Sequence, residues 1–378
     1  MTAPRVITDV LDDMVESRPD TPFVKVGDGA WMTYADVRSR ARRLAAGLAD
    51  LGVVAGDRVA LVCANRVEAI DAFFACAFLG AIEVPLNYHL RGDFLRYQLV
   101  DCAATVLLAD DAGLAMAAPI LAETSVRTTV SLDDGYDGLL DRLDDFEPVA
   151  ARPSDIVSIL YTSGTTGRPK GCMLSHGYYC ASGRATGARG WVIDGDRMFV
   201  AFPHFHASFR LNTLATALVN GASMAYEPEF HASTFMRRAA EVQATMVWGL
   251  GSMAMAILAQ PPRADDVVAG LRMSAWVPLV PDRQIELQER FGGVVNCEAY
   301  AQTEVNPIVM TPPDSPLRHR QRGGLPSDLY EVRVVDANDE PVPTGGVGEI
   351  VVRPHDVDAM FSGYWANPEA TVRTFRNL

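Results

Sequence analysis

Helix-like and strand-like hydrophobic patterns alternate along the first third of the chain, and this alternation constrains the fold more than any other feature. The helix patterns lie at 33–51, 68–79 and 93–100, and the strand patterns lie at 58–63, 82–86 and 105–108. Thr33 can cap the first helix and Gly52 can end it. The strand patterns are almost entirely apolar, as expected of strands that are covered on both faces. The alternation therefore predicts an α/β fold with mainly parallel sheets flanked by helices.

The length of the chain and a change of pattern near its end indicate more than one packed unit. The chain has 378 residues, whereas single hydrophobic cores stop growing at roughly 250–300 residues. A second α/β stretch covers about 198–304, and short β-rich segments alternate with turns at 331–354, which is typical of antiparallel hairpins or a small barrel. We therefore expect two stacked α/β subdomains, roughly 1–195 and 196–320, and a small β-barrel-like subdomain at 321–378.

Composition and charge argue against several classes of function. The formal net charge is −14, and no basic face that could bind nucleic acid is apparent. The N-terminal segment lacks a secretory-signal pattern, and the longest apolar stretch, Ala72 to Ile82, is too short to span a bilayer. Six cysteines lie far apart without CxxC spacing, which indicates buried free thiols in a reducing compartment. We expect a cytoplasmic protein that binds neither nucleic acid nor membrane, with a homodimer as the default state.

The stretch YTSGTTGRPKG, at 161–171, has the composition of a phosphate-binding loop. It follows a strand pattern at 155–160, and open α/β sheets bind ligands at the carboxyl ends of their strands. Its glycines let backbone N–H groups approach anionic oxygens, its hydroxyls add donors, and Lys170 adds a positive charge. The spacing differs from that of a nucleoside-triphosphate P-loop, and Pro169 removes one donor. The alternative is a solvated turn between the strand and a helix that Ser175 can cap.

YTSGTTGRPKG resembles the phosphate-binding signature of the adenylate-forming superfamily, which contains acyl- and aryl-CoA ligases, adenylation domains of nonribosomal synthetases and luciferases. Further stretches are similar to motifs of this family and occur in its order: FPHFHAS (Phe202 to Ser208), YAQTE (Tyr300 to Glu304), and GGVGEIVVRP with FSGYWANPEAT (Gly345 to Thr371). The resemblance runs from about Thr33 to the last residue. The chain looks most like the N-terminal domain of an acyl-CoA ligase.

The resemblance implies a reaction that uses ATP, Mg²⁺ and coenzyme A. A carboxylic acid attacks the α-phosphate of ATP, pyrophosphate leaves, and a thiol then captures the acyl-adenylate. The residues implied to act in catalysis are Thr162, Lys170, Thr303 and Glu304, with Glu304 as the Mg²⁺ ligand. The residues implied to bind the nucleotide are Ser163, Gly164, Thr165, Thr166, Gly167, Ala275, Trp276, Val277, Glu298, Ala299, Tyr300 and Ala301. Without the family context, a Thr-Glu pair is more often a helix cap with a solvated carboxylate.

The acid site is expected around a histidine in an aromatic stretch. The residues alone favour a satisfied core side chain for His206 over a catalyst. The resemblance implies instead that Phe205 and His206 line the carboxylate site as an aromatic gate. We expect no general base, since a carboxylate is already ionised at neutral pH. The resemblance also places Trp248, Gly249 and Gly251 along the acid pocket, where the glycines either leave room for a large acid or mark a strand end.

The chain departs from the family pattern at two places. Ala299 and Ala301 replace glycines that are usual beside the adenine-stacking tyrosine, and Trp276 adds bulk near the nucleotide. These substitutions lead to the hypothesis of a partial ligase that uses a preformed acyl-adenylate. The family's Thr-Gly-Asp motif and C-terminal lid do not occur in 1–378, so we expect an N-terminal core that is nearly inactive by itself. An enzyme that loads a carrier protein and a scaffold that has lost the chemistry remain as alternatives.

Overall fold

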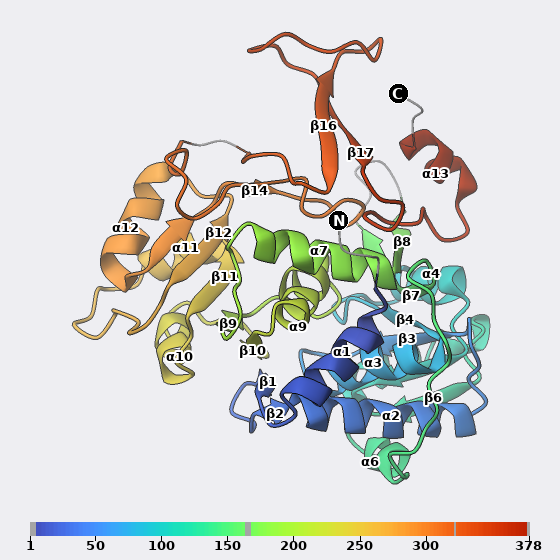
Figure 1. Ribbon diagram of the computed structural model, residues 1–378. Helices are drawn as coiled ribbons and strands as arrows, with labels where there is room; N and C mark the ends of the chain where they lie inside the picture. The colour runs from blue at the N-terminus through green and yellow to red at the C-terminus, as the bar shows by residue number, and fades with distance from the viewer. Residues whose placement is uncertain (1–4, 163–167, 321–322, 376–378) are drawn as a thin grey trace.

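The computed structural model describes residues 5–162, 168–320 and 323–375, which form two large sheets with helices packed around them (Figure 1). The first sheet has six strands in the order β6-β5-β3-β4-β7-β8. Its strands are β3 (Arg58–Val62), β4 (Ile82–Pro85), β5 (Val106–Ala109), β6 (Thr128–Ser131), β7 (Ile156–Thr162) and β8 (Lys170–Ser175). All neighbouring strands pair in parallel except β7 and β8, which are antiparallel. The predicted alternation of strands and helices is confirmed here.

The second sheet has seven strands in the order β13-β12-β11-β9-β10-β1-β2. Its strands are β1 (Pro22–Val26), β2 (Met32–Thr33), β9 (Arg197–Val200), β10 (Ser223–Tyr226), β11 (Met246–Leu250), β12 (Met273–Val277) and β13 (Val294–Asn296). Strand β1 pairs in parallel with β10, although the two lie far apart in the sequence. The N-terminal segment therefore belongs to the second sheet, which the sequence analysis did not anticipate. Both α/β units that the sequence predicts are present.

Helices cover both faces of the sheets, and two of them begin at the residues predicted to cap them. They are α1 (Ile7–Ser17), α2 (Tyr34–Asp50), α3 (Glu68–Leu79), α4 (Asp93–Cys102), α5 (Asp111–Ala117), α6 (Tyr136–Leu140), α7 (His176–Ala188), α8 (Ala207–Phe209), the π-helix η2 (Arg210–Ala215), α9 (Thr216–Val219), α10 (Phe235–Glu241), α11 (Gly251–Leu258), α12 (Pro281–Phe291) and α13 (Pro368–Thr374), with a short 3₁₀ turn η1 (Leu121–Glu123). Thr33 and Asp36 form a reciprocal capping box at the start of α2. The Ser175 hydroxyl accepts a hydrogen bond from the Tyr178 N–H at the start of α7.

The tail of the chain forms hairpins instead of the small barrel that was one reading of its pattern. Strands β16 (Tyr330–Val335) and β17 (Glu349–Pro354) pair in antiparallel, as predicted, and project above the two α/β units (Figure 1). Strands β14 (Ala299–Tyr300) and β15 (Val309–Met310) form a second two-stranded sheet. The described residues contain no closed barrel, because two strands cannot pair both of their edges with each other.

The glycine-rich stretch joins two strands, which corrects the expectation that it leads from a strand to a helix. Strand β7 extends through Thr162, and Lys170 begins β8, so the stretch connects the two arms of an antiparallel pair. The register places Thr162 opposite Lys170. Helix α7 begins only at His176, after β8 has ended. The pattern analysis missed β8 because its glycine and polar residues do not read as a buried strand.

The thiols agree with the expectation of buried free cysteines. All six cysteines are free and buried. Within the described ranges, the structure contains no helix with the length and apolar character needed to cross a membrane.

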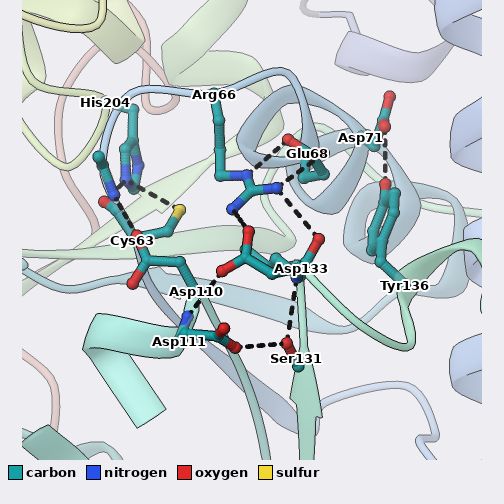
Figure 2. A network of polar contacts seen from close by, with 12 residues as sticks. Cys63, Arg66, Glu68, Asp71, Asp110, Asp111, Ser131, Asp133, Tyr136 and His204 are labelled. Carbon is teal, nitrogen blue, oxygen red and sulfur yellow. Dashed lines mark hydrogen bonds and ion pairs between the residues drawn. The ribbon is translucent and has the colours of Figure 1, made fainter. Parts of the chain in front are cut away.

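Polar side chains join the loop after β3 to the loop after β9, and so join the two sheets. Asn65 donates hydrogen bonds to the carbonyl oxygens of Phe202 (2.9 Å) and Glu227 (3.1 Å) and accepts one from the His204 N–H (2.8 Å). The His204 ring lies against Cys63, with Nε2 2.8 Å from its carbonyl oxygen and 3.6 Å from its Sγ (Figure 2). Burial lowers the pKa of His204 to about 3, so the ring is neutral and serves packing.

Arg66, on the same loop, ties together the carboxyl ends of the neighbouring strands. Its guanidinium donates to the carboxylates of Glu68 (2.8 Å) and Asp133 (2.7 Å) (Figure 2). The second oxygen of Asp133 accepts from the N–H of Asp111, at the start of α5. These contacts fix the loop that carries Asn65.

A buried ion pair lies at the same junction. Arg210, in η2, and Glu83, in β4, expose no side-chain surface, and Nη2 of Arg210 donates to Oε1 of Glu83 at 2.6 Å. Nε of Arg210 also donates to the His204 carbonyl oxygen at 2.7 Å. Removal from water raises the pKa of Glu83 to about 7, although Arg210 opposes this shift. Because neither charge reaches water, each depends on the other for compensation.

We predict that Glu83→Gln strongly destabilises the fold. The substitution leaves the Arg210 guanidinium buried without a countercharge, which costs about 3–5 kcal/mol in the free energy of unfolding. Urea denaturation measures this loss. Arg237→Ala, which breaks an exposed ion pair with Glu241 in α10, serves as the control and should change stability by less than about 0.5 kcal/mol. A loss below about 1 kcal/mol for Glu83→Gln would contradict the dependence on this pair.

Candidate active site

Residues from separate parts of the sequence meet at the start of β8. Lys170 places its Nζ 4.2 Å from the centroid of the Tyr364 ring. The Tyr364 hydroxyl donates a hydrogen bond to Oε1 of Glu304 at 2.7 Å. Burial and the neighbouring Glu304 carboxylate raise the pKa of Tyr364, so its hydroxyl stays protonated and can donate. Lys170 and Glu304, which the sequence assigns to the phosphates and the metal, therefore contact the same tyrosine.

The other two residues expected to act in catalysis are Thr162, at the end of β7, and Thr303, which precedes Glu304 in the loop after β14. Thr162 is the register partner of Lys170, and its hydroxyl donates to the Lys170 carbonyl oxygen at 3.4 Å. The backbone of Thr303 is held by α7, because the Tyr178 hydroxyl donates to its carbonyl oxygen at 3.1 Å. Strand β8, helix α7 and Tyr364 thus hold all four residues. Ser163, Gly164, Thr165, Thr166 and Gly167, which were expected to hold phosphate, lie outside the described residues.

A cavity of about 630 Å³ lies beside Glu304. Its lining includes Tyr300, Gln302 and Glu304, strand β17, and the stacked rings of Phe361 and Phe375. Tyr300 is 38% exposed, and Gln302 donates to its hydroxyl at 2.7 Å. The ring is therefore accessible and held in one orientation. A volume of this size is typical of small-molecule sites.

The remaining residues expected at the nucleotide differ in how accessible they are. Ala275 is buried, Val277 and Ala299 are half-buried, and Ala301 is exposed. The Glu298 side chain is 1% exposed and points into the protein, where it accepts from the His319 N–H at 2.9 Å. That carboxylate is therefore engaged within the protein.

Trp276 corrects the sequence interpretation, because its side chain has no surface exposed to solvent. Successive residues of a strand point to opposite faces, so Ala275 and Trp276 belong to different core clusters. The indole packs against Phe235 with the ring centroids 6.1 Å apart, and lies over Gly249. The expectation that this side chain adds bulk near the nucleotide is therefore wrong. It fills the core on the far face of the sheet.

Gly249 and Gly251 are required by packing, which decides between the two readings of these glycines. A Cβ atom on Gly249 would lie 2.4 Å from the Trp276 ring, and one on Gly251 would lie 1.7 Å from the Pro278 carbonyl oxygen. The space that the glycines leave is thus occupied by protein, so it does not admit a large acid. Trp248 points to the opposite face, where it is nearly buried and packs against Trp191 with the ring centroids 5.1 Å apart.

Phe205 and His206 lie in the loop that Asn65 and Arg210 hold. The His206 ring keeps exposed surface, and its Nδ1 accepts from the Ser208 N–H at 3.1 Å, which caps α8. The surrounding protein atoms lower the pKa of His206, so the ring is neutral at pH 7. Phe205 meets the Tyr88 ring edge to face. A neutral, partly exposed imidazole fits a side chain that lines a site.

Sequence reasoning missed two residues that lie within this site. Tyr364 belongs to the Gly-Tyr-Trp motif, but the motif alone gave no role for it. Cys172 follows Lys170 by two residues, and burial together with the Glu304 carboxylate raises the pKa of its thiol, so the thiol stays protonated. The signal that could have found both residues is the return of the tail to β8, where Cys172 and Tyr364 form an antiparallel bridge.

We predict that Gly251→Ala destabilises the fold. A methyl group cannot occupy the position of the Pro278 carbonyl oxygen, so the backbone must move, at a cost of about 1–3 kcal/mol. The midpoint of urea unfolding measures the loss. Gly138→Ala, in α6, is the control, because no atom lies within 4 Å of the added Cβ and alanine favours helix. Equal stability of both variants would contradict the packing requirement and would favour the alternative, in which Gly251 leaves room for an acid.

Comparisons with known proteins identify the family of the chain. The model of the family described as AMP-binding enzyme matches residues 11–365. A feruloyl-CoA synthase from Amycolatopsis sp is 31% identical over 363 residues, which cover 95% of this chain and 71% of that protein. An indoleacetate–CoA ligase from Aromatoleum aromaticum is 29% identical over 357 residues, which cover 92% of this chain and 69% of that protein.

Solved structures have the same fold. ATP-bound MatB from Rhodopseudomonas palustris aligns with a TM-score of 0.86 and 26% identity, over 99% of this chain and 74% of that chain. A fatty acyl CoA synthetase from Mycobacterium tuberculosis aligns with a TM-score of 0.89 over 98% of this chain and 74% of that chain, and at 24% identity it supports the fold alone. With its family model, its relatives and its fold in agreement, the chain belongs to the adenylate-forming acyl-CoA ligases of the AMP-binding enzyme family.

Proposed function

We propose that this protein activates a carboxylic acid with ATP and transfers the acyl group to coenzyme A. In the first step a carboxylate oxygen attacks the α-phosphorus, the bond to the bridging oxygen of the β-phosphate breaks, and pyrophosphate leaves. In the second step the thiol sulfur attacks the acyl carbon, AMP leaves, and the thiol proton passes to water. The observation that carries the proposal is the meeting of Lys170, Tyr364 and Glu304, of which Glu304 lines an open cavity.

Residues near Glu304 and in the loop after β9 would supply charge and positioning. Displacement at phosphorus moves negative charge onto the departing pyrophosphate, and Lys170 beside Thr162 offers a positive charge and a hydroxyl for it. The exposed Tyr300 ring offers a face for the adenine. Phe205 and the neutral His206 would line the carboxylate site, with no proton to remove.

Mg²⁺ fits the donor that the site provides. Within the described ranges no three His, Cys, Asp or Glu side chains gather as a metal site, and Glu304 is the protein ligand that the family resemblance implies. Mg²⁺ is usually bound by one or two carboxylates together with substrate phosphates and water. Oε1 of Glu304 accepts from Tyr364, which leaves the second oxygen as the candidate ligand. The bound cation would neutralise phosphate charge.

A partial ligase that consumes a preformed acyl-adenylate is the second candidate. Ala299 and Ala301 still support it, since each adds a methyl group beside Tyr300. Trp276 was the third substitution that favoured the partial ligase, and its burial removes that argument. We therefore favour the complete reaction, with an enzyme that loads a carrier protein and a scaffold protein as further outcomes to be tested.

We propose aromatic acids as the first class of substrate to test. The names of two relatives, a feruloyl-CoA synthase and an indoleacetate–CoA ligase, refer to acids of this class.

We also propose subdomain boundaries near 195 and 320, a homodimer and a cytoplasmic location. Residues 1–378 match 71% of the feruloyl-CoA synthase, and we propose that they bind ligands but turn over slowly by themselves.

The test is product formation from two sets of substrates. Full-length protein is incubated with ATP, Mg²⁺, coenzyme A and ferulate, indoleacetate or a fatty acid, and then with synthetic acyl-adenylates and coenzyme A. Acyl-CoA from the free acid supports the complete reaction, and acyl-CoA from the adenylate alone supports the partial ligase. Transfer only to a carrier protein supports that alternative. If no combination gives a product, the proposal is overturned and the scaffold alternative remains.

We predict that Lys170→Met lowers the rate of adenylate formation by about 100-fold or more, because a positive charge at the departing pyrophosphate is lost. The sequence contains two lysines, Lys170 and Lys25, so Lys25→Met is a matched control. Lys25 donates to the Gly29 carbonyl oxygen in its own turn, and its variant should keep the rate within about twofold. Single-turnover release of pyrophosphate measures the rate. Equal rates for the two variants would contradict the role of Lys170.

A further inference from the structure

The backbone around Tyr364 is held on both sides, so the position of its ring is determined by the fold. Met173 in β8 exchanges backbone hydrogen bonds with this segment, accepting from the Ser362 N–H (2.8 Å) and donating to the Gly363 carbonyl oxygen (3.0 Å). On the other side, the Tyr364 N–H donates to the Thr371 hydroxyl of α13 at 2.9 Å. The tail therefore adds an extended segment to the edge of β8.

The same segment also holds the backbone of Glu304. The Phe361 N–H donates to the Glu304 carbonyl oxygen at 3.0 Å, and the Tyr364 hydroxyl reaches the carboxylate of the same residue. Main chain and side chain of Glu304 are thus fixed by two residues of one short segment. Lys170 is fixed through β8, to which that segment is paired.

Tyr364 lies between a cation and an anion that do not contact each other. The Lys170 ammonium lies over the face of the ring, and the hydroxyl at the edge of the ring donates a hydrogen bond to the Glu304 carboxylate. No ion pair joins Lys170 to Glu304 within the described ranges. A direct pair would neutralise both groups, and a phosphate or a cation would then have to break it before binding. The tyrosine offers each group a weaker partner that a ligand can replace.

We propose that Tyr364 is a positioning residue that keeps Lys170 and Glu304 apart and aligned, so that the nucleotide phosphate meets a free ammonium and Mg²⁺ meets an ordered carboxylate. The inference rests on the proposed function, because it takes ATP and Mg²⁺ as the ligands of this site. It assigns two separate roles to one side chain. The ring spaces the charges, and the hydroxyl orients the carboxylate.

Two substitutions separate the roles of the ring and the hydroxyl. Tyr364→Phe keeps the ring as a spacer but removes the hydroxyl donor. The Mg²⁺ concentration that gives half of the Mg²⁺-dependent increase in ATP affinity should therefore rise about tenfold. Its affinity for ATP in the presence of a chelator should stay within about twofold, because Lys170 keeps its ring. Tyr364→Leu removes the spacer, so Lys170 can pair with Glu304, and ATP affinity with chelator present should fall about tenfold. Isothermal titration calorimetry with ATP measures both quantities without turnover.

A second substitution distinguishes this mechanism from simple damage to the site. Adding Glu304→Gln to Tyr364→Leu removes the competing carboxylate, so the chelator-treated affinity for ATP should recover most of the tenfold loss. A protein whose site has merely collapsed would lose affinity further. Tyr330→Phe is the matched control, because the hydroxyl of this buried tyrosine donates to the backbone oxygens of Asn306 and Ala359 instead of to the Glu304 carboxylate.

The outcomes separate the inference from the proposed function. If unsubstituted protein shows no Mg²⁺-dependent binding of ATP, the proposed function fails and this inference fails with it. Normal binding by that protein, with Tyr364→Phe indistinguishable from Tyr330→Phe, would overturn the inference alone. Failure of Glu304→Gln to restore ATP affinity in the Tyr364→Leu background would also overturn it. Recovery in that background, together with a shifted Mg²⁺ requirement for Tyr364→Phe, supports it.

Discussion

The ion pair between Arg210 and Glu83 connects the two α/β units without access to water. A guanidinium in this position must keep its carboxylate partner, because an unpaired buried charge costs several kcal/mol. The pair therefore fixes the distance between η2 and β4. Arg210 also holds the His204 carbonyl oxygen, and Asn65 holds the His204 N–H. The loop that carries Phe205 and His206 takes its position from this junction, so the acid site proposed there depends on a contact that lies outside it.

The second condition for the site is the return of the tail to the first sheet. Residues around Tyr364 pair with β8 at the point where Lys170 begins that strand. This pairing brings Tyr364 of the Gly-Tyr-Trp motif against both Lys170 and Glu304. A protonated tyrosine can serve both charges, since its ring face attracts a cation and its hydroxyl donates to a carboxylate. The sheet edge thus determines the geometry of the charges.

The accuracy of the sequence analysis differed between patterns and individual side chains. Helix α3 occupies the predicted range, and Thr33 and Ser175 cap the helices they were expected to cap, because these signals are local. Strand β1 was missed because five residues without regular alternation carry a weak pattern, and only its pairing with β10 identifies it. Trp276 was assigned to the nucleotide from its neighbours in sequence, but adjacent strand residues face opposite sides of a sheet. Its partner in the core is Gly249, on another strand.

The sequence by itself determined the class of fold, the family motifs and their order, because hydrophobic period and short motifs are properties of contiguous residues. The resemblance that its motifs carry also predicted catalytic roles for Thr162, Lys170, Thr303 and Glu304, and these roles stay predictions. Only the tertiary structure decided that Tyr364 joins Lys170 to Glu304 and that the glycines after Trp248 make room for protein atoms. Such contacts depend on which strands become neighbours and which faces they present. Pairing between distant segments sets both, and no local pattern encodes it.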